Sequence, residues 1–140
     1  MIVVGVGCGP GMLTYEAIKA IEAASLIYGS VRSIILAKPH IGPACRVEVI
    51  EDYGNLDALP KDSVVLSTGD PMLAGLGHLG DEVIPGVSSM QLAFARLKLP
   101  LENGTVVSVH CRARKMRPRR WRRRLTAEGS FSCWPTLRST

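Results

Sequence analysis

The segment Met1–Gly11, MIVVGVGCGPG, joins a short apolar run to a loop that contains four glycines. The β-branched residues Ile2, Val3 and Val4 favour an extended, buried strand. Glycines directly after a strand allow positive φ angles and a close approach of the backbone to a ligand. The opening of the chain therefore predicts a buried strand that ends in a glycine-rich connection.

Segments of strand and helix character alternate along the rest of the sequence. Apolar residues at Ala17, Ile18, Ile21 and Ala24 follow helical spacing, and Thr14 is placed to cap that helix. The alternation predicts an α/β domain with a mostly parallel sheet flanked by helices. We expect further strands at residues 26–28, 46–50, 63–67, 81–84 and 105–110, and further helices at residues 29–38 and 89–99.

The charge of the chain is unevenly distributed. Residues 1–110 hold 7 Lys and Arg against 11 Asp and Glu, whereas residues 111–140 hold 10 against 1. The net charge of +5 therefore arises entirely in the last thirty residues, and residues 1–110 are mildly acidic. We expect one α/β domain over residues 1–110 and a basic, disordered or frameshifted tail over residues 111–140, where apolar periodicity is lost.

The four cysteines are scattered without a CxxC pair or a nearby histidine at metal-ligand spacing. This pattern fits neither a disulfide framework nor a metal site, so we expect a reducing, cytoplasmic location and no metal. The first apolar run is too short for a signal peptide, and no run has the length of a membrane span.

Three of the predicted strands run into turns rich in glycine or proline. The turns cover residues 5–11, 68–77 and 84–89, and the second of them carries the carboxylate of Asp70. In a parallel sheet these turns lie on one edge, at the carboxyl ends of the strands, where open α/β sheets bind ligands. The alternative is that each is only a tight connection between a strand and a helix.

The first turn departs from the known phosphate-binding loops. Pro10 stands where a dinucleotide-binding helix would begin, no acidic residue ends the following strand, and no Gly-Lys-Ser/Thr follows. A nucleotide phosphate is therefore not the expected ligand, whereas an adenosine without phosphates is compatible with the loop.

The segments GVGCGPGMLTYEAIKAIEAASLI, STGDPMLAGLG and VIPGVSSMQLAFARL resemble, in this order, three motif blocks of the tetrapyrrole methylases. These are the class III S-adenosylmethionine-dependent methyltransferases of corrin and sirohaem synthesis, and the resemblance extends from Met1 to about His110. Within the family, YGSVRSI, GDPMLAGLG and SSMQLAFARLKLP look most like the branch that methylates carbon 5 of cobalt-precorrin-7.

The resemblance implies methyl transfer from S-adenosylmethionine to carbon 5 of a cobalt-precorrin in cobalamin (vitamin B12) biosynthesis. It also implies a tetrapyrrole substrate and a companion enzyme that methylates carbon 15 and decarboxylates. A sulfonium methyl is already activated, so the protein mainly aligns it with a nucleophilic carbon and excludes water. No catalytic residue is assigned, because no nucleophile and base pair is visible.

The resemblance also places ligand contacts. Arg32 is expected to meet a substrate carboxylate, the alternative being a solvated charge at a helix start. The first loop is shortened to GMLT and the helix after residue 77 is clipped, so the loops around the ligand differ from the family pattern. The residues expected to contact the cofactor are Pro10, Thr68, Gly69, Asp70, Leu73, Ser88 and Ser89.

The segment Arg112–Leu125, RARKMRPRRWRRRL, stands where family members continue into a second domain. Read in another frame, its arginine codons become codons for Ala, Glu, Gln or Lys, and residues 128–139 can yield a strand followed by an Asp-Pro turn. We therefore hypothesise a frameshift near residues 111–114, which the underlying DNA would test, and expect the polypeptide as written to be a poor enzyme.

Several alternatives remain open. The first alternative is another class III methylase, which acts on another precorrin carbon or resembles diphthine synthase. The second alternative is a binding module without catalytic activity. In a third alternative the basic tail is genuine and binds nucleic acid, with Trp121 stacking on bases, although residues 1–110 look like a domain that binds a small molecule.

The sheet is expected to have exposed edge strands, which favour pairing with a second copy of the chain as a homodimer.

Overall fold

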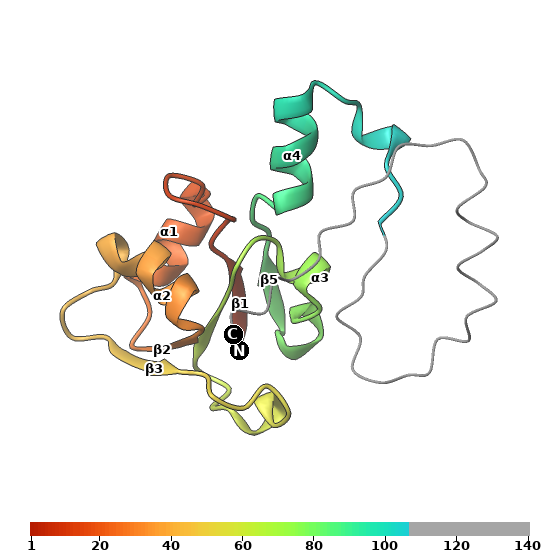
Figure 1. Cartoon of the computed structure of the whole chain (residues 1–140). Helices are drawn as coiled ribbons and strands as arrows, with labels where there is room; N and C mark the ends of the chain where they lie inside the picture. The colour runs from red at the N-terminus through yellow and green to blue at the C-terminus, as the bar shows by residue number, and fades with distance from the viewer. Residues whose placement is uncertain (107–140) are drawn as a thin grey trace, which may run out of the picture. The chain divides into compact units, whose positions relative to one another are not determined.

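A computed structural model describes residues 1–106 (Figure 1). The chain divides into two units, Met1–Leu92 and Ala93–Thr140, and the first contains a five-stranded sheet. Every strand pair is parallel, which confirms the predicted α/β class. In the order β3-β2-β4-β1-β5, β4 is the central strand. The strands are β1 (Ile2–Gly5), β2 (Leu26–Gly29), β3 (Arg46–Val49), β4 (Val64–Ser67) and β5 (Glu82–Ile84).

The helices agree with the sequence pattern, with one addition. The α-helices are α1 (Tyr15–Glu22), α2 (Val31–Ala37), α3 (Pro71–Ala74) and α4 (Ser89–Leu97), and short 3₁₀ turns cover Lys38–His40, Leu56–Ala58, Gly77–Leu79 and Leu101–Asn103. The sequence predicts a loop over residues 68–77, and the structure shows the single helical turn α3 within it. Of the strand predicted at residues 105–110, the structure shows Thr105 and Val106 outside any strand. The rest of that strand and the basic tail lie outside the described residues.

The two faces of the sheet are covered unequally. Figure 1 shows α1 and α2 on one side of the sheet and α3 on the other. The larger core cluster combines Val4 and Leu66 with Ala17 and Ile21 of α1 and Ala37 of α2. On the opposite face the smaller cluster is formed by Val3, Ile50, Leu56 and Val65. Alternate residues of β1 and β4 therefore bury on opposite faces, as the continuous apolar runs require.

Local sequence explains where the helices begin and end. Thr14 caps α1, with its hydroxyl accepting from the Ala17 N–H at 3.1 Å, as predicted. Helix α4 ends in a Schellman motif, in which the Leu99 N–H donates to the Phe94 carbonyl and Lys98 adopts a φ of 55°.

None of the helices in residues 1–106 combines the length and the hydropathy that a membrane span requires.

Candidate functional site

Three glycine-bearing loops meet at the carboxyl edge of the sheet. They are the first loop, residues 5–11, the second loop, residues 68–77, and the third loop, residues 84–89. Strands β1 and β4 are in register from Ile2 with Val64 to Gly5 with Ser67, so both end at the same level. Beyond them the Gly69 N–H donates to the Gly7 carbonyl at 2.8 Å, which joins the first loop to the second. The predicted convergence of these loops is confirmed.

Two glycines are required by the close approach of the third loop. A Cβ built on Gly86 would lie 2.3 Å from the Gly69 carbonyl oxygen and 2.8 Å from the Gly5 backbone. A Cβ on Gly5 would lie 2.5 Å from the Gly86 nitrogen. These distances exclude any side chain at either position without movement of the backbone, so the three loops touch through bare main chain.

Asp70 holds the second and third loops together. Its Oδ1 accepts from the N–H groups of Met72 and Leu73 at 2.9 and 3.2 Å, which makes it the N-cap of α3. Its Oδ2 accepts from the Gly86 N–H at 3.3 Å. Both carboxylate oxygens therefore bond the protein's own backbone, and the contact of Asp70 with a cofactor stays a prediction.

Ser88 and Gln91 form a capping box at the start of α4. The Ser88 Oγ accepts from the Gln91 N–H at 3.1 Å, and the Gln91 Oε1 accepts from the Ser88 N–H at 2.8 Å. Ser88 is buried, whereas Ser89, the first residue of the helix, is exposed. Of the two serines predicted to meet the cofactor, Ser89 has the more accessible side chain.

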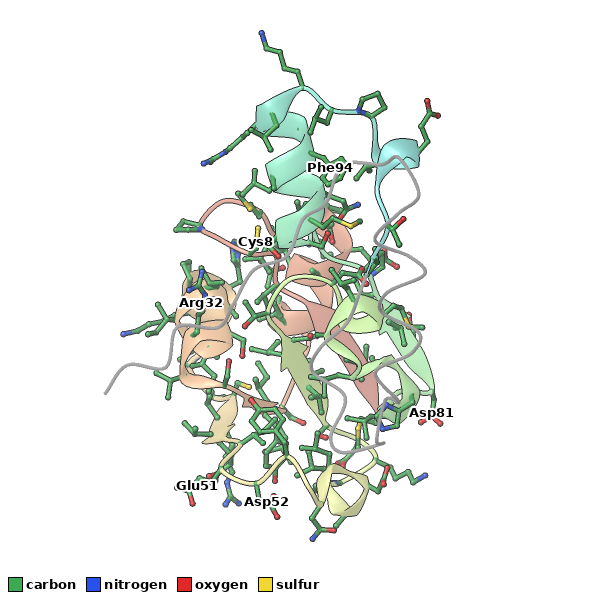
Figure 2. The ribbon with its side chains drawn as sticks, turned by 45° about the vertical axis from the view of Figure 1, so that its right-hand side comes forward. Cys8, Arg32, Glu51, Asp52, Asp81 and Phe94 are labelled. Atoms are coloured by element: carbon green, nitrogen blue, oxygen red, sulfur yellow. The ribbon has the colours of Figure 1, made fainter. Side chains whose placement is uncertain are left out.

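Arg32 links the start of α2 to the first loop. Its guanidinium donates to the Cys8 carbonyl at 2.9 Å, and the side chain is exposed (Figure 2). Because a guanidinium has five N–H donors, this contact leaves most of its hydrogen-bonding capacity for other partners. The expectation that Arg32 meets a substrate carboxylate is compatible with this position and stays a prediction.

The remaining predicted residues lie on the same loops with different exposure. Pro10 is exposed, Thr68 and Leu73 are half-buried, and Gly69 is buried with a φ of 76°. The structure thus brings Gly69 and Asp70 into contact with the first and third loops. Within the described part of the chain Pro10 makes no hydrogen bond to either neighbouring loop, so Pro10 shares the edge of the sheet with them and no more.

Sequence reasoning did not single out Ser67, the last residue of β4. Its side chain is 1% exposed, and its Oγ has no hydrogen-bond partner among the described residues. The signal in the sequence was a hydroxyl at the end of an otherwise apolar strand, directly before Thr68. Burial without a partner, however, is visible only in the folded chain.

The groups at this edge are mainly backbone and neutral polar side chains. Glycine main chain, the half-buried Thr68 and the short α3 lie at this edge, the Ser67 hydroxyl is buried beneath it, and Asp70 is already bonded. Across residues 1–106, no three His, Cys, Asp or Glu side chains are grouped to hold a metal ion. The arrangement suits the alignment of a ligand that brings its own reactive group.

Known proteins with similar sequences point to one family. The chain is 35% identical to a probable cobalt-precorrin-7 C(5)-methyltransferase of Methanocaldococcus jannaschii, over 75% of this chain and 58% of that protein. It is 32% identical to a precorrin-6Y C(5,15)-methyltransferase [decarboxylating] of Sinorhizobium, over 80% of this chain and 30% of that protein. The chain thus spans less than two thirds of the length of these relatives.

A solved structure has the same fold. The precorrin-6Y methylase of cobalamin biosynthesis from Archaeoglobus fulgidus superposes with a TM-score of 0.68 and 34% identity, over 79% of this chain and 64% of that one. The family model for Tetrapyrrole (Corrin/Porphyrin) Methylases matches residues 1–133, nearly the whole sequence. With the fold, the converging loops and this match together, the chain belongs to the tetrapyrrole (corrin/porphyrin) methylases.

Proposed function

We propose that this chain contributes the cofactor-binding edge of an S-adenosylmethionine-dependent methyltransferase that acts on carbon 5 of a cobalt-precorrin in cobalamin biosynthesis. The observation that carries the proposal is the contact of three loops through Gly5, Gly69 and Gly86, in a chain 35% identical to a carbon-5 methyltransferase. We further propose that residues 1–110 form one domain. The proposed tail, residues 111–140, lies outside the described residues.

The residues at the edge fit S-adenosylmethionine. Its adenosyl part is uncharged and polar, and it matches a surface of main chain and hydroxyls better than a cluster of charges would. The Ser67 hydroxyl is buried without a partner at this place, and Gly69 has a positive φ with only the Ser88 Cα within 4 Å of an added Cβ. Room beside Gly69 and an unused hydroxyl are features of a binding site rather than of a closed turn.

Each loop has a distinct task in the proposed site. Thr68, Gly69 and Leu73 would hold the cofactor from the second loop, Pro10 from the first, and Ser88 and Ser89 from the third. Asp70 fixes the shape of the second loop through its bonds to α3 and to Gly86. The bound cofactor supplies an activated methyl group on a sulfonium. The chain supplies alignment and shields the reacting groups from water.

Arg32 is the proposed contact for the substrate. A tetrapyrrole with several carboxylates presents planar anions, which a guanidinium recognises with two parallel hydrogen bonds. Arg32 lies at the start of α2, bonded to the first loop through Cys8. It therefore stands on the same edge as the loops proposed to hold the cofactor.

The first test is binding by the full chain. Titration calorimetry with S-adenosylmethionine and with its demethylated product should detect both ligands, whereas ATP, which carries phosphates, should bind far more weakly. If neither adenosyl ligand binds, the proposed function is wrong and the chain is a binding module for something else.

The second test identifies the acceptor. The chain and the methyl-labelled cofactor are incubated separately with a series of cobalt-precorrins and with the diphthine precursor, and the labelled position is found by NMR. Label at carbon 5 supports the proposal. Label at another carbon, or on the diphthine precursor instead, would assign the chain to another branch of the family. A companion carbon-15 methylase with decarboxylase activity should then use the product.

A further inference from the structure

We infer that Ser67 is a further cofactor-contacting residue, whose hydroxyl hydrogen-bonds a polar group of the adenosyl ligand. The inference rests on the proposed function and adds a residue to it. Ser67 ends the central strand β4 and directly precedes the loop residues Thr68 and Gly69. Its strand partner on β1 is Gly5, the glycine on which the third loop rests.

The state of the Ser67 hydroxyl differs from that of every other buried serine in the described part of the chain. The hydroxyl of Ser33 donates to the Ser30 carbonyl at 2.9 Å, and that of Ser63 donates to the Pro60 carbonyl at 2.6 Å. The Ser88 hydroxyl accepts from the Gln91 N–H. Of the buried side-chain nitrogen and oxygen atoms in residues 1–106, only the Ser67 Oγ lacks a partner, and Ser67 ends the strand that leads into the second loop.

Its position on the sheet directs the hydroxyl to the face beneath the third loop. Ser67 follows Val65 by two residues, so both side chains lie on the face of the smaller core cluster, opposite α1 and α2. Gly5 follows Val3 on the same face and is in close contact with Gly86. The hydroxyl therefore stands beside the Gly5–Gly86 contact, away from the main core.

A buried hydroxyl without a partner has lost its hydrogen bonds to water and gained none in the protein. If position 67 had only a structural role, alanine would be more stable there than serine, because alanine has no hydroxyl that needs a hydrogen-bond partner. A ligand atom that reaches the hydroxyl restores the missing bond without competition from solvent. Because serine both donates and accepts, it suits the uncharged polar atoms of an adenosyl group.

The inference predicts opposite outcomes for two serines, of which Ser67 ends strand β4 and Ser63 directly precedes it. Ser67→Ala should leave the thermal stability of the ligand-free chain unchanged or raised, and should weaken the affinity for S-adenosylmethionine and its demethylated product by roughly tenfold or more. The matched control, Ser63→Ala, breaks the bond to Pro60 at the other end of β4. It should lower thermal stability and leave the affinity for both ligands unchanged.

Calorimetry and thermal melts of the full-length wild type and the two variants decide the matter. Equal affinity of Ser67→Ala and the wild type would overturn the role of Ser67 and leave the proposed function standing. Loss of stability in Ser67→Ala, as in Ser63→Ala, with unchanged affinity, would also overturn it and show a partner inside the folded chain. Absence of adenosyl binding by the wild type would overturn the proposed function and this inference together.

Discussion

The two edges of the sheet are held together in different ways. At the carboxyl edge, main-chain and side-chain bonds join residues far apart in sequence, such as Gly7 with Gly69 and Asp70 with Gly86. At the amino edge, the Met1 ammonium forms an exposed ion pair with Asp81, and the hydroxyl of Ser63 donates to the carbonyl of Pro60, three residues earlier. Figure 2 labels Asp81. Both edges also have long-range main-chain bonds, such as that from the Asp81 N–H to the Met1 carbonyl at the amino edge. The comparison teaches that the side-chain bonds differ: at the carboxyl edge the Asp70 carboxylate joins two loops, whereas at the amino edge the side-chain bonds are solvent-exposed or local.

Gly86→Ala is the substitution expected to destabilise the carboxyl edge most. The new Cβ would lie 2.3 Å from the Gly69 carbonyl oxygen, and the clashing atoms are backbone, which cannot rotate away. We expect a loss of about 3 kcal/mol or more in the free energy of unfolding, measured by urea denaturation. Gly42→Ala is the control, since nothing lies within 4 Å of its Cβ, and it should change stability by less than about 0.5 kcal/mol. Equal effects of the two substitutions would contradict the close contact.

A smaller loss is expected from Asp70→Ala. The substitution removes the cap of α3 and the bond to Gly86, and we expect a cost of about 1–3 kcal/mol in the free energy of unfolding. Asp52→Ala removes a single exposed bond to the Gly54 N–H and serves as the control. If Asp70→Ala were no more destabilising than the control, the carboxylate would not be what joins the loops.

Arg32→Ala should affect ligand binding more than stability. Its exposed bond to the Cys8 carbonyl contributes less than about 1 kcal/mol to folding, yet the proposed function gives its guanidinium a substrate carboxylate to hold. Calorimetry with a polycarboxylate tetrapyrrole should show weaker binding for Arg32→Ala. Binding should be unchanged for Arg46→Ala, another exposed arginine, which pairs with Glu48 on the edge strand. Equal affinity of both variants would remove Arg32 from the site.

The smallest effect belongs to the amino edge and depends on pH. The hydrogen bond from the Met1 ammonium, together with its charge, lowers the pKa of Asp81 below its usual range. A carboxyl whose pKa is lower in the folded than in the unfolded state stabilises the fold at neutral pH. That contribution declines below about pH 4 and is lost once the pH falls below the folded pKa. The stability difference between wild type and Asp81→Asn should therefore be small at pH 7 and vanish in acid. A difference that does not decline as the pH is lowered below about 4 would show another origin.

Much of the fold was predictable because it follows from short-range patterns. The apolar runs of β1 and β4, the helical spacing of Ala17 and Ile21, and the cap at Thr14 each involve residues within a few positions of one another. The single turn α3 escaped prediction, because four residues between glycines carry too little periodicity to distinguish a helix from a loop. Parallel strands then bring their loops to one edge by topology alone.

The sequence by itself determined the α/β class, the edge of the sheet at which the glycine-bearing loops gather, and which loops reach it. The tertiary structure alone decided that Asp70 bonds Gly86, that Gly5 and Gly86 tolerate no side chain, and that Ser67 is buried without a partner. The reason is physical: strand and helix patterns are written in neighbouring residues. Hydrogen-bond partners and steric clearance, by contrast, depend on atoms that the chain brings together only after folding, such as those of Gly7 and Gly69.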